Sequence, residues 1–347
     1  MPPGVFSCRL SGIAERNSSV KKSLTFLLFL VLLCAVGSAP ACAEFSPPET
    51  PAPARMHVPP AVTPEPPPIL NRIRDPKCLD SVRFHLDVKL LDIWFPDIMN
   101  ADEAILLYDG EVWLIDCGDE KNGVRGAELL KKLGVTKIDK LFVSHPHHDH
   151  INGLAVTDET ASVEQLLVCF PPDSTESMIK AMDYAETAGI TVKEYEDGDV
   201  FAMGDGRVTL KFFCNDDPAL DMNNNSAVTL LQHGTRRMLF CADMERPGQA
   251  VLTSRVSPEA LQADILKYPH HGKSGLMDEF LQAVSPSVAV ITNTSVRWGG
   301  VEYLSWRMIP YYYTVWYTAT ANYLHLYTDG SVWVIEYVPV DSVRPRS

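Results

Sequence analysis

The sequence predicts an α/β protein in which two β-sheets pack together and helices cover their outer faces. Apolar runs with strand composition alternate with helical segments along most of the chain. Asp109-Gly110 and Asp329-Gly330 each separate two such runs, as the turn of a β-hairpin does. Apolar residues make up 46% of the 347 positions, which is enough for a large core. Several hairpins with helices between them favour two packed sheets over a single one.

The first 43 residues have the pattern of an export signal. Lys21 and Lys22 precede the thirteen-residue apolar run Leu24–Val36, and Ala41-Cys42-Ala43 fits a small-residue cleavage site. The alternative is an uncleaved membrane anchor, but the apolar run is short for a span of about 20 residues. We therefore expect residues 1–43 to be a signal peptide, with an N-terminal anchor as the alternative.

Proline dominates the segment that follows. Ten prolines fall between Pro47 and Pro68, so residues 44–76 are expected to form an extended linker that buries no core. A folded domain is expected at 77–338, followed by a short tail at 339–347. Such a linker would hold the domain away from a membrane or wall. The expected location is secreted or extracellular, with association to a membrane or cell wall as a variant.

Charge limits the partners of the folded domain. The net charge is −14, and residues 1–43 contribute +3, which leaves −17 on the rest of the chain. A surface this acidic repels long polyanions, so extended binding of nucleic acid is disfavoured. A bound metal ion would still attract a single phosphate locally. Contact with a membrane is expected only through an uncleaved leader.

Cysteine usage leaves two interpretations. Five of the eight cysteines follow the leader, and four of these five lie in apolar, strand-like runs. Export would permit disulfides, but the pattern favours buried free thiols. No C-x-x-C spacing indicates a structural zinc site.

The elements are predicted from local patterns in chain order. Gly134 ends a helical pattern at 126–134 as a C-terminal cap, and Asp173 with Glu176 has the spacing of a capping box before the helix at 177–189. Strands are predicted at 84–94, 103–118 (a hairpin), 140–145, 163–170, 191–195, 206–213, 227–232, 236–243, 263–268, 287–293 and 323–337 (a hairpin). Further helices are predicted near 248–254 and 277–284.

The stretch SHPHHDH, residues 144–150, concentrates metal-binding side chains directly after a predicted strand. His145 and His147 are two apart, and Asp149 and His150 follow in a loop that should turn into a helix at 151–153. Imidazole nitrogens and carboxylate oxygens are ligands for zinc and similar ions. A loop with this spacing can direct the first pair to one ion and the second pair to another. A fortuitous histidine-rich loop is the alternative, and the downstream motifs weigh against it.

These residues resemble the metallo-β-lactamase superfamily. HPHHDH matches its H-x-H-x-D-H signature, residues 101–118 resemble its opening hairpin, and MLFCADM resembles the strand that delivers a metal-bridging carboxylate. ILKYPHHGKSG and NNNSAVTLL resemble the ComEC-like branch, related to the hydrolase domain of the DNA-uptake channel protein ComEC. The resemblance covers roughly Val82 to Tyr337. It implies a four-layer αβ/βα sandwich with a metal site at one edge, between the sheets.

The resemblance also implies a set of ligands for two divalent ions. His145 and His147 would hold the first ion, Asp149 and His150 the second, and Asp243 would bridge both. One histidine of the His-His-Gly motif would complete the second site, and the other would contact substrate or donate a proton. Their individual assignment is open, and we take His270 as the ligand and His271 as the catalytic residue.

One departure from the superfamily pattern concerns the first ion. Many members supply a third histidine between the signature and the bridging aspartate, whereas no histidine occurs from Ile151 to Gln232. Asn225 or Ser226, or a water, can take that corner, so occupancy of both sites is open and manganese is as suitable as zinc. Asn225, Ser226, Lys273 and Asn293 are the expected substrate-binding residues. Asp116 is expected to fix the histidine loop by hydrogen bonds.

The implied chemistry is hydrolysis. Divalent ions lower the pKa of water toward neutrality and so supply a hydroxide nucleophile, which Asp149 and Asp243 would help to orient. The ComEC-like resemblance implies a secreted phosphodiesterase acting on a small-molecule or polymeric phosphodiester, such as nucleic acid or a cell-wall phosphodiester. The alternatives are a hydrolase of a non-phosphate ester or lactam, and a catalytically weak binding module. No P-loop or G-x-S-x-G motif suggests another class of hydrolase.

Overall fold

The computed structural model describes residues 69–71, 89–293 and 314–345, all of which belong to one compact unit, Val62–Ser347. The predicted leader, residues 44–68 and 72–76 of the predicted linker, and the start of the strand predicted at 84–94 lie outside the described residues. Within the described ranges, no helix is both long and apolar enough to cross a membrane.

The first sheet contains nine strands and carries the histidine loop. Its order is β1-β18-β17-β2-β3-β4-β6-β8-β9. Antiparallel hairpins in its middle give way to parallel pairing from β4 through β6 and β8 to β9. The strands are β1 (Ile69–Asn71), β2 (Leu91–Phe95), β3 (Ala104–Tyr108), β4 (Glu111–Ile115), β6 (Lys140–Val143), β8 (Gln165–Val168), β9 (Thr191–Glu194), β17 (Asn322–Thr328) and β18 (Trp333–Pro339).

The second sheet contains seven strands in the order β10-β11-β12-β13-β14-β15-β16. Its first three pairings are antiparallel and its last three are parallel. The strands are β10 (Val200–Met203), β11 (Val208–Cys214), β12 (Ala227–His233), β13 (Arg236–Phe240), β14 (Ile265–Lys267), β15 (Val288–Ile291) and β16 (Thr314–Tyr317). A separate parallel pair joins β5 (Lys137–Ile138) to β7 (Ser162–Val163).

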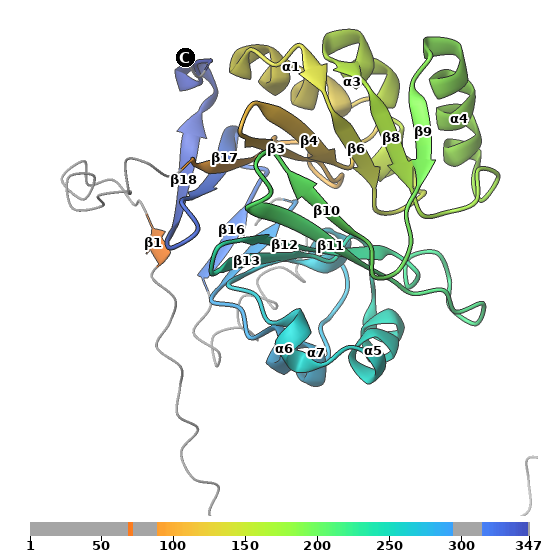
Figure 1. Cartoon of the computed structure of the whole chain (residues 1–347), viewed down its shortest axis with the longest axis vertical. Helices are drawn as coiled ribbons and strands as arrows, with labels where there is room; N and C mark the ends of the chain where they lie inside the picture. Colours follow the sequence, from red (N-terminus) through yellow and green to blue (C-terminus); the bar gives the residue numbers. More distant parts are fainter. Residues whose placement is uncertain (1–68, 72–88, 294–313, 346–347) are drawn as a thin grey trace, which may run out of the picture. The chain divides into compact units, whose positions relative to one another are not determined.

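Helices cover the outer face of each sheet (Figure 1). On the first sheet these are α1 (Gly123–Leu133), α3 (Leu154–Thr160) and α4 (Glu176–Ala188), with the single turn α2 (His148–Ile151) at its edge. On the second sheet they are α5 (Arg246–Arg255), α6 (Pro258–Leu261) and α7 (Asp278–Val284). The described residues also include the 3-10 turns η2 (Pro269–Gly272) and η4 (Val340–Ser342).

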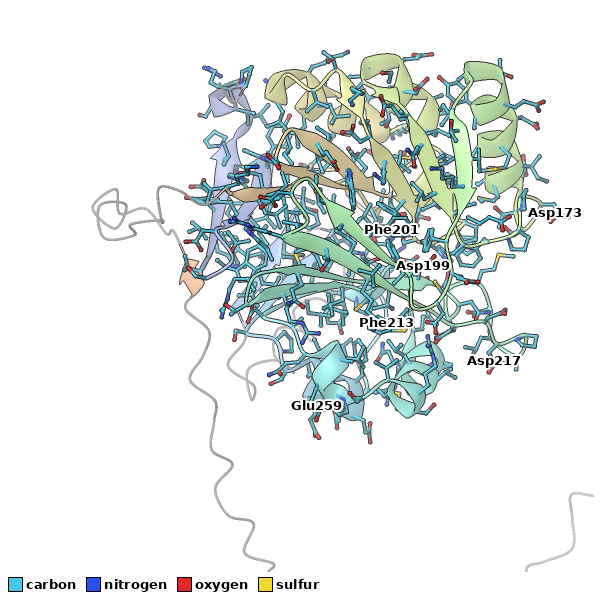
Figure 2. All side chains as sticks on the ribbon, viewed as in Figure 1. Asp173, Asp199, Phe201, Phe213, Asp217 and Glu259 are labelled. Atoms are coloured by element: carbon cyan, nitrogen blue, oxygen red, sulfur yellow. The ribbon has the colours of Figure 1, made fainter. Side chains whose placement is uncertain are left out.

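Three apolar cores separate the layers. The central core lies between the sheets, where Phe142 of β6 packs against Phe212 of β11 at 5.0 Å and Phe201 of β10 at 5.1 Å between ring centroids. Figure 2 marks Phe201 on its strand beside the first sheet. A second core joins the first sheet to α1, α3 and α4, and a third joins the second sheet to its own helices. The result is the predicted four-layer αβ/βα sandwich.

Local turn chemistry explains most element boundaries. Asp109 and Gly110 have φ values of 53° and 83°, and they form the predicted hairpin turn between β3 and β4. Gly134 ends α1 in the left-handed conformation, as predicted. The predicted capping box at Asp173 and Glu176 is wrong. Thr175 caps α4 instead, because its hydroxyl accepts a hydrogen bond from the Met178 N–H at 3.0 Å.

The thiols of the described part of the chain are free, as predicted. Cys117 and Cys241 are buried, and Cys169 and Cys214 are half-buried.

Candidate metal centre

The histidine loop leaves the end of β6 and turns at once into α2. Asp149 and His150 therefore lie on one helical turn, whereas the sequence suggested that the helix would begin after them. His145 and His150 are buried, and the side chain of His148 is 69% exposed. The turn separates His148 from its neighbours because successive helical residues point in different directions.

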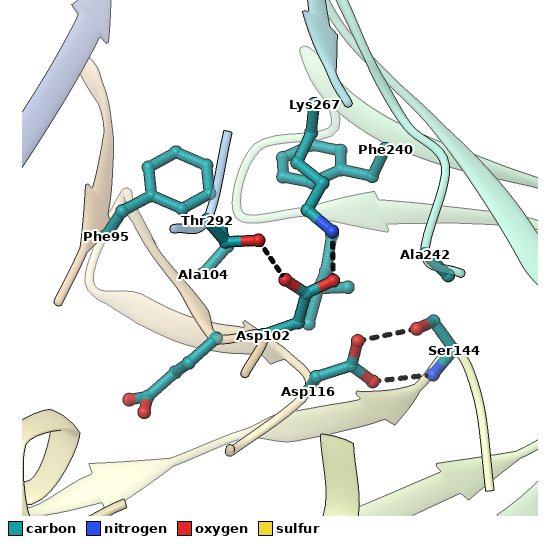
Figure 3. Close-up of a pocket in the computed structure, with 11 residues that line it drawn as sticks. Phe95, Asp102, Ala104, Asp116, Ser144, Phe240, Ala242, Lys267 and Thr292 are labelled. Carbon is teal, nitrogen blue, oxygen red and sulfur yellow. Dashed lines mark hydrogen bonds and ion pairs between the residues drawn. The ribbon is translucent and has the colours of Figure 1, made fainter. Parts of the chain in front are cut away.

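Asp116, at the end of β4, anchors this loop. Its carboxylate accepts hydrogen bonds from Ser144 N–H at 2.8 Å, from Ser144 Oγ at 2.5 Å and from His150 Nδ1 at 2.8 Å. Figure 3 shows the two contacts with Ser144. The predicted role of Asp116 is confirmed, and its contact leaves Nε2 of His150 with a lone pair for a metal ion.

Backbone hydrogen bonds tie the same loop to both sheets. Ala227 N–H, at the start of β12, donates to Ser144 O at 2.9 Å, and Cys117 N–H donates to His150 O at 2.8 Å. Thr175 Oγ1 donates to Pro146 O at 2.6 Å, which joins the loop to α4. The loop is therefore held rigidly at the edge between the two sheets.

Four side chains from three segments converge at this edge. His150 Nε2 lies 3.3 Å from Asp243 Oδ1, and His271 Nε2 lies 3.4 Å from the same oxygen. His271 Nε2 is also 3.3 Å from Asp149 Oδ2. Asp243 comes from the end of β13, and His271 comes from η2 after β14. Residues that are 122 positions apart in sequence, Asp149 and His271, thus meet at one point.

The arrangement fits a divalent metal ion. Among the described residues, four buried polar atoms at this point have no hydrogen-bond partner: His145 Nε2, His150 Nε2, His271 Nε2 and Asp243 Oδ1. Buried polar atoms without partners are costly and rare. Imidazole nitrogens and carboxylate oxygens that face one another at these distances are the donor set that zinc or manganese accepts.

The residues predicted for the first ion also lie together. The rings of His145 and His147 are 4.1 Å apart between centroids, and His145 is 5.0 Å from His150. His145 is buried and His147 is half-buried. The structure thus brings together all of His145, His147, Asp149, His150 and Asp243.

The neighbouring residues Asn225 and Ser226 make contacts in different places. Ser226 Oγ lies 3.2 Å from His145 Nδ1 and 3.4 Å from Asp243 N, so it sits directly behind two predicted ligands. Asn225 is occupied elsewhere. Its side chain accepts from Asp217 N–H and donates to Asp217 O and Leu220 O, which stabilises the loop before β12. Its contacts give no support to the predicted substrate-binding role.

The two neighbouring histidines of η2, His270 and His271, differ in burial and in what they face. His271 is fully buried and its Nε2 faces Asp149 and Asp243. The His270 side chain is 19% exposed, and its nearest contact with the group is 3.6 Å, between Nε2 and Asp243 Oδ2. The assignment of His270 as ligand and His271 as catalytic residue stays a prediction, and the contacts favour the opposite assignment, which is taken up in the proposal below. Both residues have positive φ, 48° at His270 and 50° at His271.

His270 has a carboxylate partner of its own. Its Nδ1 lies 2.8 Å from Glu245 Oε1, and Ser274 Oγ donates to the same oxygen at 2.7 Å. Lys273 is exposed, close in sequence to His270 and Ser274. Asn293 is buried and donates from Nδ2 to His271 O at 3.2 Å, so its visible contact supports the loop.

Backbone strain is concentrated at the site. Among the described non-glycine residues with positive φ are Asp116 (60°), Ala242 (45°), His270 (48°) and His271 (50°). Each lies at or next to a residue that forms the group. Such conformations cost about 1–3 kcal/mol each and persist at functional sites where surrounding contacts enforce them.

The charges of the group are strongly coupled through burial. Burial lowers the pKa of His145 well below its usual value, and it also lowers the pKa of His147. Burial opposes charge on His150 and His271 as well, but Asp243 outweighs it and raises the pKa of both. Burial likewise opposes ionisation of Asp243, yet His271 and His150 hold its pKa well below the usual range. The carboxylates are therefore ionised and suited to a cation.

Sequence reasoning missed the residues behind His271. Asp102, Lys267 and Thr292 are buried next to this ring, and Lys267 and Thr292 each donate a hydrogen bond to Asp102. Asp102 and Glu103 are adjacent acidic residues before an apolar strand, and this pattern did not indicate a role for Asp102. A lysine inside the apolar run 263–268 was a usable signal, because lysine is almost never fully buried unless it is paired.

Comparison with known proteins gives a partial match in sequence. Residues 104–168 match the sequence model of the metallo-beta-lactamase superfamily. ComE operon protein 3 of Bacillus subtilis is 28% identical over 165 residues, which are 47% of this chain and 21% of that protein. A ribonuclease Z of Methanococcus aeolicus is 33% identical over 102 residues, which are 27% of this chain and 31% of the relative. The chain thus spans about a fifth to a third of these curated relatives.

Solved structures also include similar chains. The metallo-beta-lactamase fold protein YhfI of Bacillus subtilis matches 68% of this chain and 99% of its own, with 12% identity and a TM-score of 0.46.

Proposed function

We propose that this protein, which carries a metallo-beta-lactamase superfamily hydrolase domain, is a metal-dependent phosphodiesterase. The observation that carries the proposal is the group of buried, unpartnered atoms of His145, His150, His271 and Asp243 at the edge between the sheets. Burial has removed these atoms from water without giving them a hydrogen bond, which is costly, and a bound cation would offset that cost.

The ligands divide into two sets around Asp243. His145 and His147 would hold one ion with Asp243, and Asp149, His150 and His271 would hold the other. Bound divalent ions would lower the pKa of water and polarise a phosphoryl oxygen. Around them, Asp116 and Ser226 fix the ring orientations of His150 and His145 through hydrogen bonds of 2.8 and 3.2 Å.

His270 is the proposed proton donor to the leaving oxygen. It is the half-buried member of the pair, so a substrate atom can reach its Nε2, which lies 3.6 Å from Asp243 Oδ2. Glu245 accepts from Nδ1 at 2.8 Å and orients the ring. A positioned histidine of this kind contributes about 10²–10⁴-fold to rate.

Two observations support a phosphodiester as the substrate. Lys273 is exposed next to His270, where its ammonium can meet a phosphate oxygen. Curated relatives bear the name ribonuclease Z, and a ribonuclease acts on phosphodiester bonds. The charge of −14 disfavours long polyanions, so a small phosphodiester or the end of a chain is the proposed substrate rather than the body of a nucleic acid.

The test is a substrate screen with the full chain after loading with zinc or manganese. The screen contains bis(p-nitrophenyl) phosphate, a short single-stranded RNA and DNA, a p-nitrophenyl acyl ester and a β-lactam. Asp243→Asn removes the bridging carboxylate, and Asp183→Asn, on the exposed face of α4, is the matched control.

The expected result is cleavage of the phosphodiesters that Asp243→Asn abolishes and Asp183→Asn leaves unchanged. Hydrolysis of the acyl ester or the lactam alone would replace the proposal with a different hydrolase. Binding of metal without cleavage of any substrate would favour a binding module on the same fold.

We also propose that the enzyme acts outside the cytoplasm. The support is the apolar run Leu24–Val36 after two lysines and the proline-rich segment that follows. The N-terminal sequence of protein recovered from expressing cells tests it. A start near Glu44 in an extracellular or envelope fraction is expected, and an intact Met1 on protein in the cytoplasmic fraction would contradict it.

A further inference from the structure

Asp102 lies buried behind the metal centre with both carboxylate oxygens occupied. Thr292 Oγ1 donates to Asp102 Oδ1 at 2.5 Å, and the ammonium of Lys267 donates to Oδ2. Figure 3 shows both contacts, with Lys267 and Thr292 reaching the carboxylate from the second sheet. Asp102 is 4% exposed and Lys267 is 2% exposed, so water contributes little to this cluster.

The same carboxylate touches the rear of the His271 ring. His271 Nδ1 lies 3.1 Å from Asp102 Oδ1 and 3.1 Å from Thr292 Oγ1. The hydroxyl proton of Thr292 is directed to Asp102, so both oxygens nearest Nδ1 are acceptors. Nδ1 therefore carries the proton, and the lone pair of the neutral ring lies on Nε2, which faces Asp149 and Asp243.

The backbone of Asp102 makes hydrogen bonds to the histidine loop and to the end of the β3–β4 hairpin. Its N–H donates to Asp149 O at 3.0 Å, and its carbonyl accepts from Gly118 N–H at 2.8 Å. One residue thus fixes the carbonyl of Asp149 in the histidine loop and the ring of His271 in η2. The histidine loop follows β6 of the first sheet, and η2 follows β14 of the second sheet.

The contact with Lys267 determines whether the carboxylate of Asp102 is available to bind a metal ion. Atoms of Asp102, His150, Asp243 and His271 lie within 4.8 Å of one another, so an unoccupied Asp102 carboxylate could bind an ion itself. The Lys267 ammonium donates to Oδ2 and Thr292 Oγ1 donates to Oδ1, so both oxygens of the carboxylate are already occupied.

We propose that Asp102 and Lys267 are a positioning pair for the metal centre. Asp102 holds His271 in the tautomer that presents Nε2, and Lys267 with Thr292 holds the carboxylate of Asp102 out of the ligand set. The inference rests on the metal-binding part of the proposed function and not on the nature of the substrate.

The test is cobalt binding to the metal-stripped full chain, followed by the visible absorption of Co²⁺, which reports the number and geometry of ligands. The variants are Asp102→Asn, Lys267→Met and the double variant. Lys140→Met is the matched control, because Lys140 lies on β6 with its ammonium 4.5 Å from the centroid of the Trp113 ring.

The three variants have different expected results. Asp102→Asn leaves Lys267 buried without its ion pair and weakens cobalt binding by about 10–100-fold. Lys267→Met frees the carboxylate, which changes the cobalt spectrum. The double variant retains an amide oxygen that accepts from His271 Nδ1 and has no unpaired ion, so its affinity returns to within about tenfold of the original protein. Lys140→Met changes neither affinity nor spectrum.

Two outcomes would overturn the inference. If Asp102 is itself a ligand, the single and double asparagine variants lose affinity equally, and Lys267→Met binds cobalt as well as or better than the original protein. If the pair only stabilises the fold, the melting temperatures fall while the affinity and spectrum of the folded variants do not change. Should a single variant fail to fold, the double variant and Thr292→Val still separate these cases.

The same measurements separate this inference from the proposed function. A protein that binds cobalt with the expected pattern but cleaves no phosphodiester would end the proposed function and leave the positioning pair. Phosphodiester cleavage together with unchanged cobalt binding in all variants would do the reverse.

Discussion

Ser226 Oγ lies 3.2 Å from His145 Nδ1, in a position where both side chains are fully buried. The hydroxyl also lies 3.4 Å from Asp243 N, as the acceptor of a long hydrogen bond. A hydroxyl that accepts from Nδ1 directs the lone pair of Nε2 to the opposite side of the ring, toward the metal centre. We therefore expect Ser226 to orient His145, a predicted ligand, rather than to replace the missing third histidine.

Ser226→Ala should weaken the binding of the ion proposed to lie at His145 and His147, and it should leave the other ion in place. The expected loss of affinity is about 10–100-fold, because the ring of His145 loses the contact that fixes its tautomer. The loss of affinity is measured as the metal content per chain after dialysis against increasing concentrations of a chelator. Release of both ions together would contradict this role for Ser226, and Ser254→Ala on the exposed part of α5 is the control.

His271→Ala and His270→Ala should have different effects on metal content. His271→Ala removes a buried ligand, so the metal content falls and activity is lost with it. His270→Ala keeps the metal content and lowers kcat by about 10²–10⁴-fold, because it removes the proton donor. Elemental analysis and phosphodiesterase assays on the same preparations measure both, and an opposite pattern would restore the assignment that the sequence suggested.

Gly153→Ala should displace the histidine loop. A Cβ at Gly153 would lie 1.9 Å from Cys117 O, and Cys117 N–H is the donor to His150 O. The close atoms belong to the backbone just after β4 rather than to a flexible side chain, so we expect the change to cost about 1–3 kcal/mol and to lower the metal content. Gly275→Ala is the matched control, because a Cβ there meets nothing within 4 Å. Equal melting temperatures for the two variants would contradict the close approach.

Glu103 should make the protein less stable as the pH rises. Burial raises the pKa of this carboxyl to about 8, and neither of its oxygens has a hydrogen-bond partner among the described residues. The folded state therefore holds a proton that the unfolded chain releases near the usual value of 4.5. Stability is full below pH 4.5, falls by about 1.4 kcal/mol per pH unit from there to pH 8, and then levels off.

Glu103→Gln should remove this slope, because the amide has no proton to lose. Urea unfolding from pH 5 to pH 8 measures the difference between the two proteins, with Glu186→Gln on the exposed face of α4 as the control. The variant is expected to gain stability relative to the original protein as the pH rises. Parallel pH profiles for Glu103→Gln and the original chain would show that Glu103 is already ionised in the folded state.

Much of the fold follows from local patterns. The hairpins at Asp109-Gly110 and Asp329-Gly330 and the end of α1 at Gly134 were predictable, because turn and cap residues act over a few positions. The helix cap of α4 was not, because Asp173 and Thr175 both suit a cap. Which of them caps depends on the backbone path from β8, and Thr175 also bonds Pro146 O.

The sequence by itself determined the chemistry of this protein. The spacing of His145, His147, Asp149 and His150 after a strand, with Asp243 after another, already indicated the group that the structure brings together. Only the tertiary structure decided that His271 rather than His270 faces that group, and that Asp102 and Lys267, 165 positions apart, stand behind it. The reason is physical: sequence spacing fixes which side chains share a loop, whereas their directions depend on backbone torsions and on contacts between two sheets that only the folded chain forms.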